Sequence, residues 1–292
     1  VTAPEIIFFW VARMIVSGME FMGDIPFRNV YIHGTVRDDK GRKMSKSLGN
    51  SIDPLDVIRD TSADALRFSL MMVAAVCQDI HLSKDKFEIG RNFLTKIWNA
   101  ARFMQLHSGD GPGEFDAPDL NPAFLASDDL HLLYSLRERV GSVTESLESF
   151  RFGDAARDLY DFVWHQFCDW YIEYAKTALN GDDAARKAEV LKVMHYAFAV
   201  SLKLLHPFIP FQTEELWHAM GYGKEGDFIM RAPWPDQKDF ERWPAVTGAA
   251  TAAAYVEQKH ELIRIGRMLR ADYGLSASRK ITYLIKPASG ED

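Results

Sequence analysis

The decisive stretch of this sequence is Gly41-Arg42-Lys43-Met44-Ser45-Lys46-Ser47-Leu48-Gly49-Asn50. Its two central lysines are separated by a methionine and a serine, on a segment bounded by glycines, which predicts a solvated, mobile loop. Lysine ammonium groups are compact charges that suit a polyphosphate whose shape changes during a reaction. Such a loop can close over a triphosphate, neutralise charge on departing pyrophosphate, and open again. The alternative interpretation is an ordinary exposed basic turn.

On the C-terminal side of this loop, long amphipathic patterns dominate. Apolar residues at helical spacing predict helices over about 63–76, 86–107, 127–150, 154–180, 184–205, 211–220 and 249–273. Thr61 and Asp64 have capping-box spacing at the first helix, and Ser127 is expected to cap the third. Long helices with short connections predict an antiparallel bundle, and therefore a mainly α protein.

The sequence before the loop, and the end of the chain, show shorter patterns. Residues 1–18 predict a buried passage from strand to helix, and residues 30–32 predict a short strand that enters the loop. Residues 228–234 are expected to be extended, and residues 281–285 to form a strand. The apolar run 6–12 is too short to span a bilayer and lacks the flanks of a signal peptide. Because the chain starts inside an apolar run without methionine, we expect a fragment.

Composition and charge placement narrow the class of protein. The 292 residues are 47% hydrophobic and 26% charged, enough apolar material for one or two globular domains. The net charge is −7, yet residues 80–105 carry five basic side chains against two acids, a local charge of +3. An acidic protein can bind RNA through one basic helix. Cys77 and Cys168 stand in no metal-ligand pattern, which predicts reduced core thiols in a cytosolic protein.

Lys43-Met44-Ser45-Lys46-Ser47 resembles the KMSKS signature of class I aminoacyl-tRNA synthetases. Neighbouring segments agree with this resemblance: YIHG at residues 31–34, Asp53-Pro54, and DALR at residues 64–67. The stretch HPFIPFQTEELW at residues 206–217 is similar to the end of the anticodon-binding domain in the valyl, isoleucyl and leucyl group. Residues 8–14, FFWVARM, and residues 275–281, LSASRKI, resemble the valyl branch of that group.

The resemblance implies three parts. Residues 1–60 would be the C-terminal part of a Rossmann-like α/β catalytic domain with the KMSKS loop, and residues 61–240 an antiparallel helical-bundle anticodon-binding domain. Residues 241–292 would be a short α/β C-terminal segment, cut before a coiled coil. The full-length protein would activate valine with ATP, accompanied by Mg²⁺, and transfer it to its tRNA. The fragment alone is expected to be inactive, since the family's other ATP-binding signature is not in this sequence.

The resemblance also assigns roles to individual residues. It gives catalytic roles to Lys43 and Lys46, ATP contacts to His33, Gly34, Met44, Ser45 and Ser47, and amino-acid or adenylate contacts to Glu5, Ile6 and Trp10. Glu5 departs from the aspartate of many valyl enzymes, and the tryptophan that corresponds to Trp10 walls the valine pocket. On the residues alone, Trp10 is first explained as a core aromatic, and His33 equally well as a strand-end histidine.

The basic helix supplies candidate contacts to the tRNA anticodon. Lys86, Arg91 and Arg102 are expected to contact RNA through their charge, and Phe103 to stack on a base. The alternatives are a solvated helix start for Lys86 and core packing for Phe103. We expect a monomeric, cytoplasmic protein whose partners are a valine-accepting tRNA, valine and ATP, with no membrane contact and no metal site. An isoleucyl or leucyl enzyme, or a non-catalytic tRNA-binding or assembly module, remain as alternatives.

Overall fold

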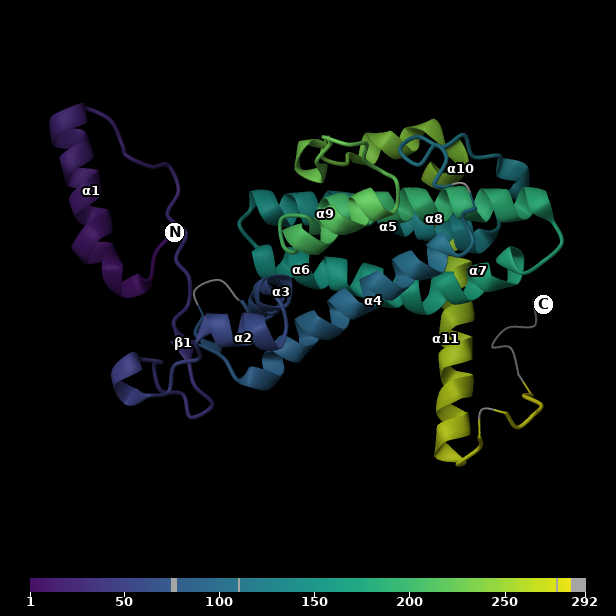
Figure 1. Ribbon diagram of the computed structural model, residues 1–292, viewed down its shortest axis with the longest axis horizontal. Coiled ribbons are helices and arrows are strands. Elements are labelled where there is room, and N and C mark those ends of the chain that lie inside the picture. Colours follow the sequence, from purple (N-terminus) through teal and green to yellow (C-terminus); the bar gives the residue numbers. More distant parts are fainter. Residues whose placement is uncertain (75–77, 110, 277, 285–292) are drawn as a thin grey trace.

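The computed structural model describes residues 1–74, 78–109, 111–276 and 278–284, which form a mainly helical protein (Figure 1). The α-helices are α1 (Ala12–Ser17), α2 (Pro54–Asp60), α3 (Ala63–Val73), α4 (Phe87–Gln105), α5 (Ser127–Glu148), α6 (Phe152–Tyr160), α7 (Ile172–Leu179), α8 (Ala184–Leu205), α9 (Pro210–Ala219), α10 (Pro244–Thr247) and α11 (Ala250–Asp272). The 3-10 helices are η1 (Pro4–Ile6), η4 (Lys46–Leu48), η5 (Lys84–Lys86), η6 (Pro122–Phe124), η8 (Ile229–Arg231) and η9 (Gln237–Arg242). The π-helices are η2 (Ile7–Val11), η3 (Gly18–Met22) and η7 (Asp161–Tyr171). Strands β1 (Val36–Arg37) and β2 (Ile80–His81) pair in parallel. The predicted mainly α class is confirmed.

Helices α4 to α9 build a long bundle, from which α11 projects at a steep angle (Figure 1). One contiguous apolar core fills this bundle, because each helix turns its periodic apolar face inward. Its largest fully buried side chains include Phe68, Phe93, Phe162, Phe167 and Phe198, with the rings of Phe68 and Phe93 stacked at 4.4 Å. Cys168 lies in this core, and burial raises the pKa of its thiol to about 12, whereas Cys77 lies outside the described residues.

Helices α3 and α4 cross at a glycine. A Cβ atom added at Gly90 would lie 2.3 Å from the carbonyl oxygen of Ala65, so a larger residue would push the helices apart. The Ser69 hydroxyl accepts a hydrogen bond from the Gly90 N–H at 3.0 Å and closes the same crossing. The close crossing ties the segment that follows the KMSKS loop to the first long helix of the bundle.

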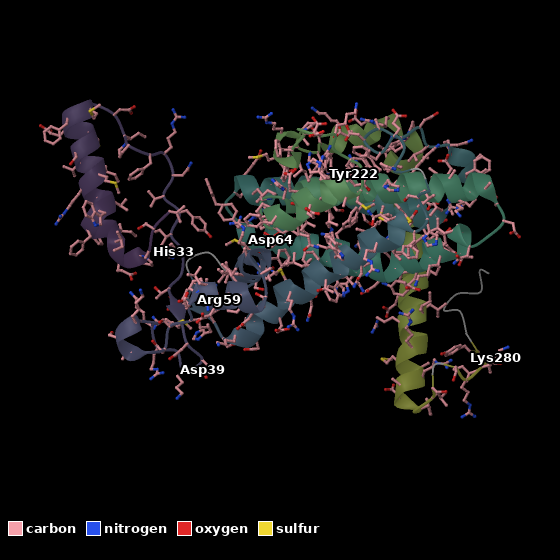
Figure 2. All side chains as sticks on the ribbon, in the orientation of Figure 1. His33, Asp39, Arg59, Asp64, Tyr222 and Lys280 are labelled. Carbon is pink, nitrogen blue, oxygen red and sulfur yellow. The ribbon has the colours of Figure 1, made fainter. Side chains whose placement is uncertain are left out.

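A second contact joins α3 to the start of α9. The buried carboxylate of Asp64 accepts hydrogen bonds from the backbone N–H groups of Gln212 (2.7 Å) and Phe211 (3.5 Å). One turn later, Arg67 donates to the carbonyl oxygens of Pro207 (2.9 Å) and Phe208 (3.2 Å). Helix N-terminal N–H groups have no partner within their own helix, so an external carboxylate satisfies them. Figure 2 shows Asp64 where the N-terminal part of the chain meets the bundle.

The N-terminal segment forms a separate unit beside this junction, with α1 standing apart from the bundle (Figure 1). A single parallel bridge joins Thr2 to Ile32, and the Tyr31 ring lies 5.4 Å from the ring of Phe152 on α6. Gly34 packs tightly here, since a Cβ atom would lie 1.6 Å from the carbonyl oxygen of Gln78. Backbone packing therefore explains this glycine without any ligand.

Helix capping differs from the prediction at two places. Ser62, in extended conformation, caps α3 by accepting from the Ala65 N–H at 3.0 Å, while the Thr61 hydroxyl bonds back to α2. The predicted Thr61–Asp64 capping box is therefore wrong, because Asp64 is engaged by α9 instead. Ser127 is the first residue inside α5, and the carboxylate of Asp129 accepts from the preceding Ala126 N–H at 2.7 Å.

The predicted strands are also shorter than expected. Residues 30–32 contribute only the bridge at Ile32, and the first 22 residues are helical from Pro4 onward rather than a strand followed by a helix. Residues 229–231 make a 3-10 turn inside the segment predicted as extended. Residues 281–284 form no strand, and residue 285 lies outside the described part of the chain. A strand needs a neighbouring edge to pair with, which a sequence pattern alone does not supply.

Helix α11 docks on the bundle through a cluster of polar and aromatic groups. Lys259 makes an ion pair with Asp128 of α5 at 2.5 Å, and the His260 ring stacks on Trp170 at 3.9 Å. The His131 ring lies edge-on to His260 at 5.6 Å. None of the helices among the described residues is both long and apolar enough to cross a membrane.

We predict that Asp64→Ala lowers the free energy of unfolding by about 1–3 kcal/mol, because two N–H groups at the start of α9 lose their charged acceptor. Urea denaturation of the purified chain measures this change. Asp161→Ala, which removes an exposed acid from η7, is the control and should change stability by less than about 0.5 kcal/mol. Equal stability of the two variants would contradict the role given to Asp64.

The docking of α11 should weaken in acid. Burial lowers the pKa of His260 to about 4 and also lowers the pKa of His131. A histidine whose pKa is depressed on folding stabilises the fold above its unfolded pKa, near 6.5, and this contribution is lost as pH falls towards 4. We expect His260→Phe to lose less stability than the parent between pH 7.5 and about 4.5 in urea titrations. The surface variant His165→Gln should behave as the parent, and identical losses in all three would contradict the prediction.

Candidate active-site loop and nucleic-acid interface

The KMSKS loop is organised around one buried carboxylate, Asp38, which follows β1. Asp38 accepts hydrogen bonds from the backbone N–H of Lys40 (3.1 Å) and of Arg42 (2.8 Å), and from the Arg42 guanidinium at 2.8 Å. Gly41, with a φ of 75°, makes the tight turn that this arrangement needs. Asp38 was not among the residues predicted from the sequence, although an Asp placed three residues before a glycine is a turn signal.

Asn50 closes the other end of the loop onto the same carboxylate. Its amide donates to Asp38 at 2.9 Å, and its carbonyl oxygen accepts from the Ser45 N–H at 2.9 Å. The Asn50 amide, and after it Arg42, hold the pKa of Asp38 well below its usual range. The loop is therefore fixed at its base as a closed turn, while its outer residues face solvent.

The side chains of the loop point in two directions, towards the protein and towards solvent. Met44 points inward and packs on a small apolar cluster that contains Val57, Leu82 and Phe87. Lys43 and Lys46 are exposed on the outer side. Ser45 caps the short turn η4 by accepting from the Leu48 N–H at 3.3 Å, and its hydroxyl lies 3.2 Å from that of Ser47. The methionine thus anchors the loop and leaves both ammonium groups on the solvent side.

The expected amino-acid contacts are only partly brought together. The Glu5 carboxylate lies 2.5 Å from Lys43 Nζ, and this hydrogen bond lowers the pKa of Glu5. His33 is exposed at the end of the bridge to Thr2, to whose carbonyl it donates its backbone N–H at 3.0 Å. Trp10 is exposed on η2 and is not a core residue in this structure, while Ile6 is half-buried.

The expected RNA contacts lie along α4 rather than in one cluster. Lys86 is exposed at the start of α4. Arg91 lies about one turn further along the helix and makes an ion pair with the preceding Glu88. Arg102 is exposed eleven residues beyond Arg91, which is about 16 Å at 1.5 Å per residue. Phe103 is half-buried and packs against the core, which leaves part of its ring exposed.

Two lysines that were not assigned to RNA from the sequence, Lys176 of α7 and Lys96 of α4, lie where these helices pack beside aromatic rings. Lys176 Nζ lies 5.9 Å from the centre of the Phe103 ring, and the centre of the His107 ring lies 4.6 Å from the same point. Lys96 lies 5.1 Å from the Trp164 ring and pairs with Asp169 at 2.6 Å. Lysine beside a half-exposed aromatic ring is a common feature of RNA-binding surfaces. The only available signal was aromatic and basic residues in neighbouring helices, which gives no indication of their pairing.

One Ser–His contact inside the bundle has hydrogen bonds that run in the wrong direction to activate the serine as a nucleophile. The Ser108 hydroxyl donates to the carbonyl oxygen of Met104 at 2.7 Å and lies 2.7 Å from His195 Nε2. The Tyr222 hydroxyl lies 2.8 Å from Nδ1, and burial lowers the pKa of His195 to about 4. All three groups are satisfied when Tyr222 donates to Nδ1 and Nε2–H donates to Ser108. This neutral histidine therefore has no free site to accept the serine proton.

Comparison with known families shows the family to which this arrangement belongs. Residues 129–285 match the anticodon-binding domain of tRNA ligase, and residues 1–83 match the tRNA synthetases class I (I, L, M and V). The chain belongs to the class I aminoacyl-tRNA synthetases. Members of this family use ATP, and the KMSKS loop lies in the part of the chain that matches the synthetase family. Within the described ranges, no group of three or more His, Cys, Asp or Glu side chains could hold a metal ion.

Related proteins agree with this membership. The chain is 43% identical to valine–tRNA ligase of Bacillus thuringiensis over 98% of its length, and 41% identical to that of Bacillus subtilis over its whole length. It spans about a third of those relatives, 31% and 32% respectively. A solved LeuRS–tRNA–LeuAMS complex from Agrobacterium radiobacter is similar in fold, with a TM-score of 0.65 and 22% identity over 84% of this chain and 28% of that one.

We predict that Asp38→Ala loosens the KMSKS loop without unfolding the protein. The amides of Lys40 and Arg42 lose their acceptor, so their hydrogen exchange should accelerate by about tenfold or more, while the melting temperature changes little. Exchange mass spectrometry of the peptides that cover the loop measures this effect. Asp39→Ala removes an exposed neighbouring acid and should leave the exchange unchanged. Equal protection in both variants would show that Asp38 does not hold the loop.

Proposed function

We propose that this chain is the KMSKS-loop and anticodon-binding region of a valine–tRNA ligase. The observation that carries the proposal is the identity of 43% to valine–tRNA ligases along 98% of the chain, which includes the whole KMSKS loop. In the full-length protein, valine and ATP would form valyl-adenylate and pyrophosphate. The valyl group would then pass to the tRNA with release of AMP. Mg²⁺ would enter with ATP as part of the substrate.

The loop geometry supports a charge-stabilising role for the two lysines. Lys43 and Lys46 face solvent on a turn whose base is held by Asp38 and Asn50. Fixed ammonium groups near the departing pyrophosphate stabilise negative charge that develops in the transition state. We assign further ATP contacts to His33, Gly34, Met44, Ser45 and Ser47, and the amino-acid and adenylate side to Glu5, Ile6 and Trp10. The inward packing of Met44 supports an indirect role, in which it positions the lysines.

The bundle would bind the anticodon arm through α4 and its neighbours. Lys86, Arg91, Arg102 and Phe103 are the proposed contacts, and the position of Lys176 over Phe103 supports adding this lysine to the surface. We divide the chain into a catalytic part at residues 1–60, the anticodon-binding bundle at residues 61–240, and the start of a C-terminal part at residues 241–292. The protein would act in the cytoplasm as a monomer, and this chain by itself would be inactive.

The proposal is tested by valine-dependent ATP–pyrophosphate exchange in the full-length protein. We expect exchange with valine to exceed exchange with isoleucine or leucine, and Lys46→Ala to slow it by roughly 10²–10³-fold, as for the loss of one preorganised charge contact. Folding should be unaffected because Lys46 is exposed.

Lys40→Ala is the matched control, since it removes an exposed lysine of the same loop outside the KMSKS string. It should exchange at nearly the parent rate. A Lys46→Ala rate within a few-fold of the parent would refute the assigned role. Faster exchange with isoleucine or leucine would move the protein to another branch of the family, and no exchange with any amino acid would favour a non-catalytic tRNA-binding module.

A further inference from the structure

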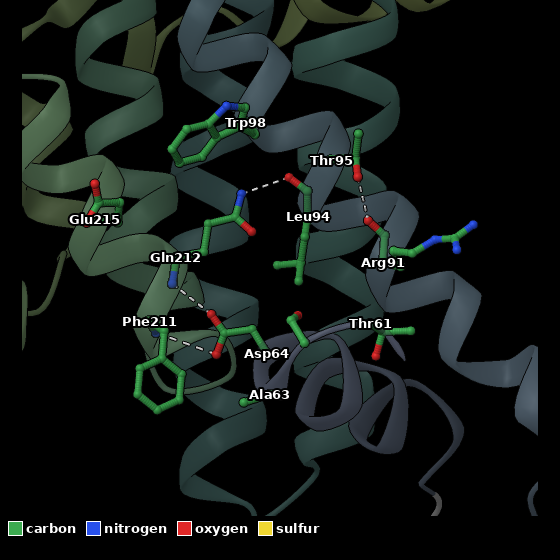
Figure 3. A pocket seen from close by; sticks show the side chains of 11 residues that line it. Thr61, Ala63, Asp64, Arg91, Leu94, Thr95, Trp98, Phe211, Gln212 and Glu215 are labelled. Atoms are coloured by element: carbon green, nitrogen blue, oxygen red, sulfur yellow. Dashed lines mark hydrogen bonds between the residues drawn. The ribbon is translucent and has the colours of Figure 1, made fainter. Parts of the chain in front are cut away.

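An open cleft of about 650 Å³ lies between the start of α3, the middle of α4 and the start of α9. Figure 3 shows Trp98 and Glu215 in one half of the view, with Ala63 and Phe211 in the other. The walls are mainly apolar, with hydroxyl and carboxylate groups between them. Its floor is the contact in which Asp64 holds the N-terminus of α9, so the cleft is built on a fixed junction of three helices.

Trp98 is the main side chain available to a ligand in this cleft. It belongs to a helix whose next residues inward, Ile97 and Ala101, are fully or almost fully buried, yet 41% of Trp98 is exposed. Phe211 on the opposite helix is 66% exposed. The Gln212 amide donates to the Leu94 carbonyl oxygen at 2.7 Å, which fixes the wall between them. Exposed aromatic faces on rigid helices are platforms for flat, aromatic ligands.

The cleft is continuous with the proposed RNA surface. Arg91, Thr95, Trp98 and Arg102 are spaced by four, three and four residues, so they form one stripe along α4. Arg91 and Trp98 line the cleft, and Arg102 stands one turn beyond it beside Phe103. An RNA strand that contacts Arg102 and continues along α4 towards the KMSKS loop would therefore pass over the cleft.

The charges of the cleft favour a base over a phosphate. Among the described residues that line it, Arg91 alone is basic, and Arg91 already pairs with Glu88. Glu215 is exposed at the rim and presents free acceptor oxygens. A carboxylate repels a phosphate, whereas it accepts hydrogen bonds from the N–H and amino groups on the edge of a base.

We propose that this cleft receives an unpaired nucleobase of the tRNA, stacked on Trp98, with its N–H edge facing Glu215. The proposal rests on the tRNA-binding function above and adds a second base contact, separate from the surface around Phe103. It would fix the position of the tRNA along α4 between the anticodon end and the KMSKS loop.

The test is an anisotropy titration of the full-length protein with a valine-accepting tRNA at several salt concentrations. Trp98→Ala should raise the Kd by about tenfold or more, since loss of one base stack is worth about 1–3 kcal/mol. The slope of log Kd against log salt should stay that of the parent, because no phosphate contact is lost. Arg102→Ala, in contrast, should reduce that slope by about one. Trp98→Phe keeps an aromatic face and should stay within a few-fold of the parent.

Trp234→Ala is the matched control, a tryptophan of similar exposure (39%) whose indole N–H bonds to Thr144 of α5. It should leave the Kd unchanged. Glu215→Gln separates base from phosphate: weaker binding supports the base, and tighter binding would mean that a phosphate occupies the cleft. Melting curves of every variant separate lost contacts from lost folding. Glu215→Gln keeps the side-chain volume, and Trp98→Phe keeps an aromatic ring.

Two further outcomes would overturn the cleft site alone. One is an unchanged Kd for Trp98→Ala while Arg102→Ala still lowers the salt slope, which leaves the proposed function intact. The other is shielding of Trp98 from acrylamide quenching in the free full-length protein, which would mean that another part of the polypeptide covers the cleft. Absence of any tRNA binding by the parent would instead refute the proposed function, and the cleft site with it.

Discussion

The buried carboxylate of Asp64 is the constraint on which the geometry of this molecule depends. It satisfies the first free N–H groups of α9, and Arg67 holds the carbonyl oxygens just before that helix. Arg67 and Phe208 are 141 positions apart in the chain, so the contact joins the two ends of the bundle sequence. Since α3 follows α2 and the KMSKS loop directly, the same contact fixes the loop relative to the bundle. The proposed base cleft is formed on this junction.

Helix α4 runs from the KMSKS-loop region to the proposed RNA surface. One of its faces packs in the core and the other faces solvent. Phe93 and Ile97 belong to the fully buried core, while Arg102 stands on the solvent side. A period of 3.6 residues per turn allows one 19-residue helix to carry both faces. Gly90 lets α3 approach its first turns closely, so the exposed stripe begins beside the segment that carries the KMSKS loop.

The acidic net charge does not oppose RNA binding, because several acids are used inside the protein. Asp38 holds the loop, Asp64 holds α9, and the fully buried Asp129 pairs with Arg186 at 2.7 Å and accepts from the Tyr171 hydroxyl at 2.6 Å. Asp38 and Asp129 are paired with Arg42 and Arg186, so these two carboxylates add little net charge to the protein surface. The local balance of charge on that helix is therefore a better guide to its partner than the net charge of −7.

The sequence by itself determined the helical class, the KMSKS string and most helix positions, since these depend on local periodicity and on adjacent residues; α8 matches its predicted range of 184–205. Only the tertiary structure decided which helix terminus each acid caps, as Asp64 does for α9. It also decided that Met44 points inward and that Trp10 is exposed. It alone brought Lys176 over Phe103, and Trp98 beside Glu215. The physical reason is that side-chain partners distant in sequence meet only once helices pack, and periodicity carries no information on which faces meet.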